Sequence, residues 1–96
     1  METIRIAVAE IRLFIPWAHS LKEKRMVVKS LAERIRNKFH LSVSEIAEQD
    51  VHQVAVLGVA GIVADAAQGD SLLEQVVRFA QGNTDAEITA VHTEYR

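Results

Sequence analysis

The sequence predicts an α+β domain in which two helices cover one face of a four-stranded antiparallel sheet. Three observations predict it: two long runs in which apolar residues alternate, two runs with apolar residues at helical spacing behind capping signals, and the order of these segments. The chain has 96 residues, which is enough for one hydrophobic core. We therefore treat residues 1–96 as a single domain.

The first strand is predicted over Glu2–Ile15, where apolar residues alternate with others. The alternation changes phase near Ala9 and Glu10, which indicates either a bulge or a strand that is covered on both faces. Pro16 cannot donate a backbone hydrogen bond to a neighbouring strand, so the strand ends there.

A helix is predicted from Ser20, its N-cap, to about Phe39, and Glu23 completes a capping box. At about 100° per residue, one side of this helix is apolar and carries Leu21, Val28, Leu31, Ala32, Ile35 and Phe39. The first turns also carry Lys22, Lys24 and Arg25. This is unusual, because the partial positive charge at a helix N-terminus favours acidic side chains.

Two further strands are predicted, a short one over Leu41–Glu48 and a long one over Val51–Val63, with a turn at Gln49–Asp50. Both faces of the long strand are apolar, with Val54, Val56 and Ile62 on one face and Ala55, Leu57, Val59 and Val63 on the other. Such a strand is typical of the centre of a sheet.

The second helix begins either after Asp65 as N-cap or at Ser71, where Glu74 would complete a capping box. Gly82–Asn83 ends it, and Thr84–Tyr95 forms the last strand. The resulting order, β-α-β-β-α-β, is that of the ferredoxin-like fold, a two-layer α+β sandwich.

This sandwich leaves one face of the sheet without helices, and the first and third strands place apolar residues there. Because a large apolar face is normally hidden by a partner, we expect a homo-oligomer, with a dimer as the first expectation. Val54 and Val56 are the predicted interface residues.

Composition narrows the class of protein. Hydrophobic residues make up 49% of the chain and charged residues 25%, which is ordinary for a globular domain. There is no cysteine, so disulfides and thiol chemistry are excluded. The N-terminal segment is interrupted by charges and resembles neither a signal peptide nor a membrane span, which makes the cytoplasm the default location.

Charge is strongly segregated along the chain. Residues 20–40 contain seven basic and two acidic side chains, a net charge of +5, and the remaining residues contain four basic and eleven acidic ones, a net charge of −7. Lys22, Arg25, Lys29 and Arg36 fall within about 60° on the helical wheel, and Lys24 points nearer the apolar side. A row of cations suits a chain of phosphates. The alternative is a solvated helix face whose cations pair with the acidic remainder of the molecule.

The candidate residues for binding nucleic acid or phosphate are therefore Lys22, Lys24, Arg25, Lys29 and Arg36, with Trp17 and His19 as further candidates. Trp17 would stack on a base, although a lone tryptophan before a helix more often packs over the end of the core. The sequence predicts no cofactor and no metal, because the histidines lack ligand spacing. Asp50 and His52 are read as turn residues rather than as a catalytic pair.

Two segments carry a family resemblance: FIPWAHSLKEKRMVVKSLAERIRNKF, and VSEIAEQDVHQVAVLGVA further along the chain. They resemble the YlxP-like family of small bacterial proteins, a domain of unknown function. The resemblance implies a ferredoxin-like fold, often dimeric, and gene neighbourhoods shared with translation initiation and ribosome maturation factors. It implies no established activity and no catalytic residues. His52 stands where the family often has tryptophan, so a stacking role is not carried over to that position.

Two functions of different classes remain open at this point. The first is a non-enzymatic accessory protein that binds RNA or phosphate through the basic helix and is linked to ribosome maturation or translation. The second is a homo-oligomeric interaction or small-ligand module that uses the apolar sheet face. No catalytic motif was found, so an enzyme is not expected.

Overall fold

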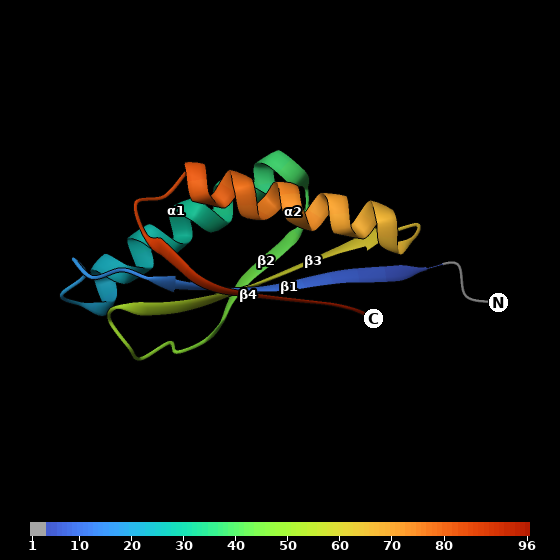
Figure 1. The fold of residues 1–96 in the computed structure, drawn as a ribbon. Helices are drawn as coiled ribbons and strands as arrows, with labels where there is room; N and C mark the ends of the chain where they lie inside the picture. The colour runs from blue at the N-terminus through green and yellow to red at the C-terminus, as the bar shows by residue number, and fades with distance from the viewer. Residues whose placement is uncertain (1–3) are drawn as a thin grey trace.

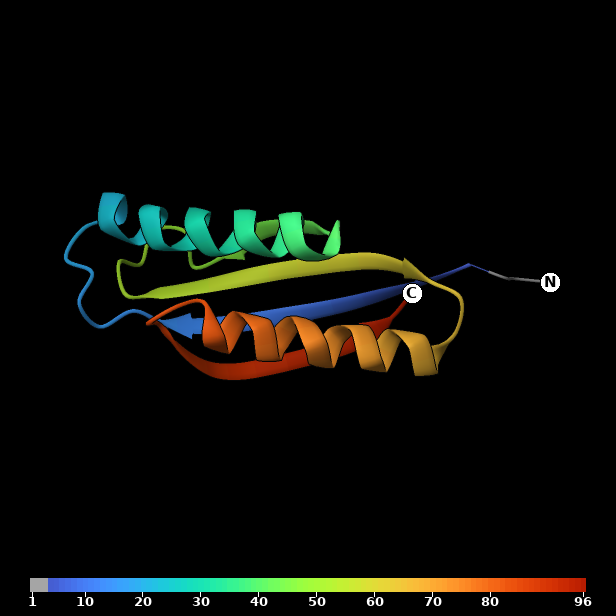
Figure 2. The ribbon, with the colours of Figure 1, turned by 90° about the horizontal axis from the view of Figure 1, so that it is seen from above.

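The computed structural model describes residues 4–96 and contains six elements in the predicted order (Figure 1). They are β1 (Arg5–Phe14), α1 (Leu21–Phe39), β2 (Ser42–Ala47), β3 (Val54–Val63), α2 (Ala66–Gly82) and β4 (Glu87–Tyr95). The sheet has the order β2-β3-β1-β4, and all of its neighbouring strands are antiparallel. Figures 1 and 2 show both helices on the same face of this sheet. The predicted ferredoxin-like α+β fold is confirmed.

Strand β1 is one of the two central strands of the sheet, and it lacks the bulge that its sequence suggested. Its register with β3 is continuous from Arg5 opposite Val63 to Phe14 opposite Val54, so the bulge considered near Ala9 is absent. The phase change has another cause. The residues at odd positions from 7 to 15 are fully buried beneath the helices, whereas the apolar residues at positions 4, 6 and 8 lie on the opposite face. The register shift occurs instead against β4, between Arg12 and Leu13. The predicted start at Glu2 lies outside the described residues.

Helix α1 begins and ends with well-formed caps. The Ser20 hydroxyl accepts a hydrogen bond of 3.1 Å from the backbone N–H of Glu23. The Glu23 carboxylate in turn accepts one of 3.3 Å from the N–H of His19, one residue earlier than in the usual capping box. At the other end, His40 adopts a left-handed conformation with φ 57°, and its N–H donates to the Arg36 carbonyl at 2.8 Å. The predicted helix is therefore confirmed at both ends.

Helix α2 begins after Asp65, whose side chain accepts a 2.8 Å hydrogen bond from the N–H of Gln68, so the alternative start at Ser71 is wrong. Gly69 in its second turn is buried. A Cβ at this position would lie 2.5 Å from the ring of Tyr95, so a larger residue would not fit. The Tyr95 hydroxyl lies 3.0 Å from the carbonyl oxygen of Ala66 and also hydrogen-bonds to the carboxylate of Asp70. The end of β4 is thereby joined to the start of α2.

This contact predicts an unusual titration of Tyr95, which is the only tyrosine in the chain. The hydrogen bond to Asp70 raises the pKa of Tyr95 from 10.0 to about 12. Because the folded pKa is the higher one, the contribution to stability is present below pH 10 and is lost as the pH rises through about 12. Absorbance at alkaline pH should show the delayed ionisation, and Asp70→Asn should lower the midpoint. A wild-type midpoint near the ordinary value would contradict the contact.

The core lies between the sheet and the two helices and includes Ile11, Leu31, Ile35, Leu57 and Val76. The predicted faces of β3 are confirmed: its odd-numbered residues 55, 57, 59 and 63 are buried against the helices, whereas Ile62 is 78% exposed on the other face. The helices also contact each other through the rings of Phe39 and Phe79, whose centroids are 5.5 Å apart.

A candidate nucleic-acid interface on helix α1

Four basic side chains form a row along the flank of α1 beside β2. Lys22, Arg25, Lys29 and Arg36 are all exposed, and we call them the cation stripe. The stripe covers 14 residue steps of the helix, or about 21 Å at about 1.5 Å per residue. At the C-terminal end of the stripe, Arg36 lies against β2 and donates a hydrogen bond of 2.5 Å to the carbonyl of Val43. The structure thus places these four predicted residues together on one surface.

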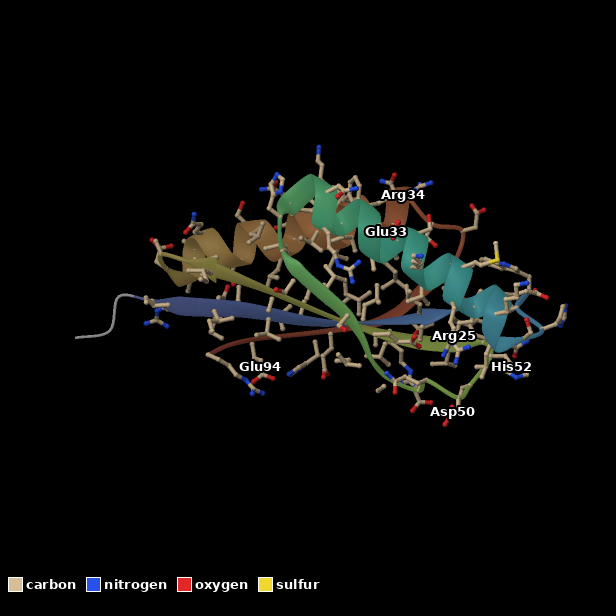
Figure 3. The ribbon with its side chains drawn as sticks, turned by 180° about the vertical axis from the view of Figure 1, so that it is seen from behind. Arg25, Glu33, Arg34, Asp50, His52 and Glu94 are labelled. Carbon is tan, nitrogen blue, oxygen red and sulfur yellow. The ribbon has the colours of Figure 1, made fainter. Side chains whose placement is uncertain are left out.

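The cation stripe has no carboxylate partners among residues 4–96. The ion pairs of the described chain involve Arg12, Lys24, Arg78, His92 and Arg96 as the cations, and none involves a member of the stripe. Asp50 and His52 lie in the loop at the same end of the molecule as Arg25 (Figure 3). The arrangement therefore differs from a solvated face in which each cation is neutralised by a neighbouring acid.

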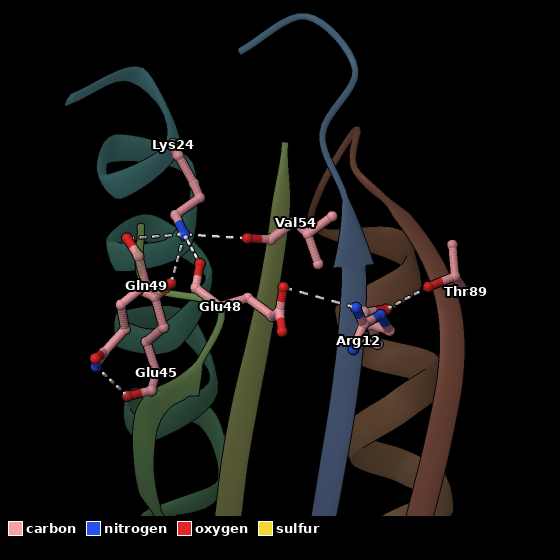
Figure 4. Close-up of polar contacts among 7 residues, drawn as sticks. All are labelled: Arg12, Lys24, Glu45, Glu48, Gln49, Val54 and Thr89. Carbon is pink, nitrogen blue, oxygen red and sulfur yellow. Dashed lines mark hydrogen bonds and ion pairs between the residues drawn. The ribbon is translucent and has the colours of Figure 1, made fainter. Parts of the chain in front are cut away.

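Lys24 has a different environment from the stripe and is completely buried. Its Nζ donates to the carbonyl oxygens of Glu48 at 2.7 Å, Val54 at 3.0 Å and Gln49 at 3.4 Å (Figure 4). It also lies 2.9 Å from Oε2 of Glu45. The ammonium is thus occupied inside the protein, and we remove Lys24 from the predicted phosphate-binding set. In the sequence, the one indication that Lys24 is buried was its position near the apolar side of the helical wheel.

The contacts of Lys24 hold the loop between β2 and β3 in place. This loop follows Glu48, which has a left-handed backbone with φ 61°, and it continues to the start of β3 at Val54. The predicted strand start at Val51 is three residues early, because β3 begins only at Val54, after a loop whose two ends are held by Lys24 through the carbonyls of Glu48 and Val54. Oε2 of Glu45 is buried without a hydrogen bond of good geometry, and the Lys24 ammonium is its neutralising neighbour.

Trp17 and His19 lie in the segment that leads into α1. The Trp17 side chain is 41% exposed, so it does not pack fully over the end of the core. It lines a groove between α1 and the segment after α2, and Met26 on the exposed side of α1 forms the edge of this groove nearest the cation stripe. His19 is exposed, and its backbone N–H is the group that bonds to Glu23.

The sheet face without helices, which we call the outer face, has an apolar end. Ile4 is 67% exposed, Ile6 38% and Ile62 78%, and Ile6 and Ile62 are register partners on β1 and β3. Of the two predicted interface residues, Val54 is half-buried and Val56 is only 7% exposed. The exposed apolar surface on this face is therefore centred on the isoleucines rather than on Val56.

Within residues 4–96, no three histidine, aspartate or glutamate side chains lie close enough together to hold a metal ion. In the same part of the chain, neither helix is both long enough and apolar enough to cross a bilayer.

Fold and site together define a small ferredoxin-like α+β domain with a basic first helix. Residues 6–93 match the family described as "Protein of unknown function (DUF503)", and the chain belongs to this family. It is 38% identical over 90 residues to "Uncharacterized protein YlxP" of Bacillus subtilis (strain 168), an alignment that covers 94% of this chain and 98% of the relative. The resemblance recognised from the sequence is confirmed.

Among solved structures, the chain is similar to "De novo designed protein Foldit4", with a TM-score of 0.53 and 14% sequence identity. The alignment covers 97% of this chain and 96% of the designed protein. At this level of identity the likeness concerns the fold alone.

Proposed function

We propose that this protein is a non-enzymatic accessory protein that binds RNA through the cation stripe of α1. The observation that carries the proposal is the exposure of four aligned cations that have no carboxylate partner among residues 4–96. A linear set of cations neutralises successive phosphates and releases their counterions. Such contacts position a protein on RNA without reading its sequence.

The energetics of the isolated helix support this reading. Lys22 and Arg25 are three residues apart, and Arg25 and Lys29 are four apart, so each pair repels on the helix surface. Each repulsion costs about 0.2–0.5 kcal/mol, and a cation in the first turn also opposes the helix dipole. A bound polyanion would remove both costs. Glu33, four residues after Lys29, offsets part of the repulsion toward the C-terminal end of the stripe, so the cost falls mainly on Lys22 and Arg25. Relief of this cost by phosphates supports the proposal.

The proposed setting is the ribosome or a ribosomal RNA precursor in the cytoplasm. This part rests on the gene neighbourhoods that the family resemblance implies, shared with translation initiation and ribosome maturation factors. The cation stripe supports the proposal that the ligand is RNA. In the proposed setting, that ligand would be ribosomal RNA.

The test compares two variants that carry the same net charge. In the first, Lys22, Arg25 and Lys29 are replaced by glutamate; in the control, the exposed residues Arg5, Arg78 and Arg96 are replaced by glutamate. Binding to a labelled structured RNA is measured by fluorescence anisotropy at two salt concentrations. With four phosphate contacts, a fourfold rise in salt should weaken wild-type binding by about 100-fold.

The stripe variant should lose binding at the lower salt concentration, and the control should retain most of it. Equal loss in the two variants would show that only net charge matters and would overturn the assignment to α1. A wild-type protein that does not bind RNA at low salt would overturn the proposed function.

A second candidate function is favoured by the outer face. Ile4, Ile6 and Ile62 are exposed on it, and a hollow of about 750 Å³ lies over Gly58 and Ala60 near the β2 edge. Adjoining exposed isoleucines and a shallow hollow on one face suit a second copy of the same chain. We propose that the outer face forms a homodimer. Arg36 of the cation stripe also lines this hollow. The dimer is compatible with RNA binding through Lys22, Arg25 and Lys29, because α1 covers the other face of the sheet.

A further inference from the structure

The groove beside Trp17 combines an aromatic ring with polar groups. Its volume is about 540 Å³, within the range of pockets that hold small ligands. Its apolar wall includes Trp17 and Met26, which are 41% and 65% exposed. Its polar lining includes Ser30 and Arg34 of α1 together with Thr84 and Asp85 from the segment after α2.

The backbone that carries Trp17 is firmly held. The N–H of Ile15 donates to the Gln53 carbonyl at 2.7 Å, and the Gln53 side-chain amide donates to the Pro16 carbonyl at 3.0 Å. Next to Trp17, Ala18 is fully buried, and its N–H donates to the Ile15 carbonyl at 3.1 Å. Trp17 is therefore an exposed aromatic ring on an anchored segment, which lowers the entropy cost of stacking a ligand against it.

The groove borders the cation stripe at Met26. Met26 follows Lys22 by four residues and precedes Lys29 by three, so it is a surface neighbour of both lysines on the helix. Neighbours of this kind have Cβ atoms about 5–6 Å apart. A phosphate chain on Lys22 and Lys29 would therefore pass within reach of the groove with its attached bases.

The polar lining can recognise the edge of a base. Arg34 supplies guanidinium donors, and its Nη1 is 3.4 Å from the Asn83 carbonyl, which holds it at the wall of the groove. The Asp85 carboxylate accepts hydrogen bonds, and the hydroxyls of Ser30 and Thr84 both donate and accept them. Such groups beside an aromatic ring are what proteins use to hold splayed, unpaired bases of RNA.

We infer that this groove receives an unpaired base of the RNA whose phosphates lie on the cation stripe, so that the ligand is single-stranded RNA or a loop rather than a continuous duplex. The inference rests on the proposed function and specifies its ligand. A base is favoured over an apolar peptide because the groove adjoins a row of cations, which attracts the phosphates attached to that base.

The experiment uses Trp17 as its own reporter, because it is the only tryptophan in the chain. The full-length protein is titrated with a single-stranded RNA oligonucleotide, with a blunt RNA duplex of equal charge, and with inorganic polyphosphate, which has no bases. Binding of all three ligands is also measured by isothermal titration calorimetry for the wild type, for Trp17→Ala and for the conservative Trp17→Phe. Circular dichroism confirms that both variants fold.

We expect single-stranded RNA to quench Trp17 fluorescence and polyphosphate to bind without quenching. Trp17→Ala should weaken single-stranded RNA binding by about tenfold, with little change for polyphosphate, and Trp17→Phe should retain most of the affinity. Binding of all three ligands without quenching, and unaffected by Trp17→Ala, would overturn the inference and leave the proposed function intact. If none of the three ligands binds, the proposed function itself fails. Emission that depends on protein concentration instead of RNA would assign the groove to a second copy and overturn the inference.

Discussion

Replacing Lys24 with methionine is expected to lower the free energy of unfolding by about 3–5 kcal/mol. Lys24 is fully buried, and its ammonium neutralises Glu45 at 2.9 Å while it donates to the backbone of Glu48 and Val54. Methionine has a similar length but no donor. The carboxylate would then be left without its counter-charge, and the carbonyls would lose their hydrogen-bond partner.

Urea denaturation followed by circular dichroism measures this loss. Lys29→Met is the matched control, because Lys29 lies on the same helix but is exposed, and its effect should stay within about 0.5 kcal/mol. The double variant Lys24→Met, Glu45→Leu should recover part of the loss, because it removes both charges of the pair. A Lys24→Met protein as stable as Lys29→Met would contradict the buried contacts.

The second large effect is expected at the outer face of the sheet. With Ile6→Asp and Ile62→Asp together, the homodimer should weaken by at least about 100-fold, because each interface would have to bury unpaired carboxylates. The two residues face each other across β1 and β3 and are 38% and 78% exposed in the single chain. Their replacement should therefore leave the fold of the single chain intact.

Analytical ultracentrifugation at micromolar concentration measures the outcome. The wild type should sediment at about twice the chain mass of 10.7 kDa, and the double variant at the chain mass itself. Val51→Asp is the control, because Val51 is 42% exposed but lies in the loop before β3. A wild type that sediments as a monomer would contradict the dimer.

Val56→Asp would not serve for this test, although Val56 was a predicted interface residue. Its register partners are Arg12 on β1 and Ala47 on β2, and the Arg12 guanidinium lies 3.9 Å from a carboxylate oxygen of Glu48. These neighbours leave Val56 only 7% exposed in the single chain. An aspartate there would destabilise the fold, so a loss of assembly would have no clear meaning.

Local sequence signals were sufficient for the order and type of the elements. The cap at Ser20, the alternation in β3 and the apolar face of α1 depend on spacing along the chain, and all three are present in the structure. The cation stripe was predictable for the same reason, since a helical wheel needs only residue numbers. The starts of β3 and β4 were less accurate, because the loops before them are shaped by long-range contacts.

Part of the candidate site could likewise be predicted from local spacing, and part depends on long-range contacts. That Lys22, Arg25, Lys29 and Arg36 share one flank of α1 follows from the sequence, but their lack of carboxylate partners in the described chain depends on where the acidic residues of other elements lie. The groove at Trp17 could not be predicted either. It requires α1 and the segment around Thr84 to meet, although these lie far apart in the chain.

The α+β class, the two layers, the basic helix and its caps could all be predicted from the sequence, because propensity, capping and periodicity act between residues a few positions apart. Two features could be seen only after the elements had packed together: Lys24 is an internal counter-ion while Lys22 and Arg25 have no carboxylate partner among residues 4–96, and the isoleucines of the outer face stay exposed. Burial and ion pairing depend on distances between elements, which spacing along the chain does not contain. Lys24 meets the carbonyl of Val54, thirty positions away, only once α1 has packed on the sheet.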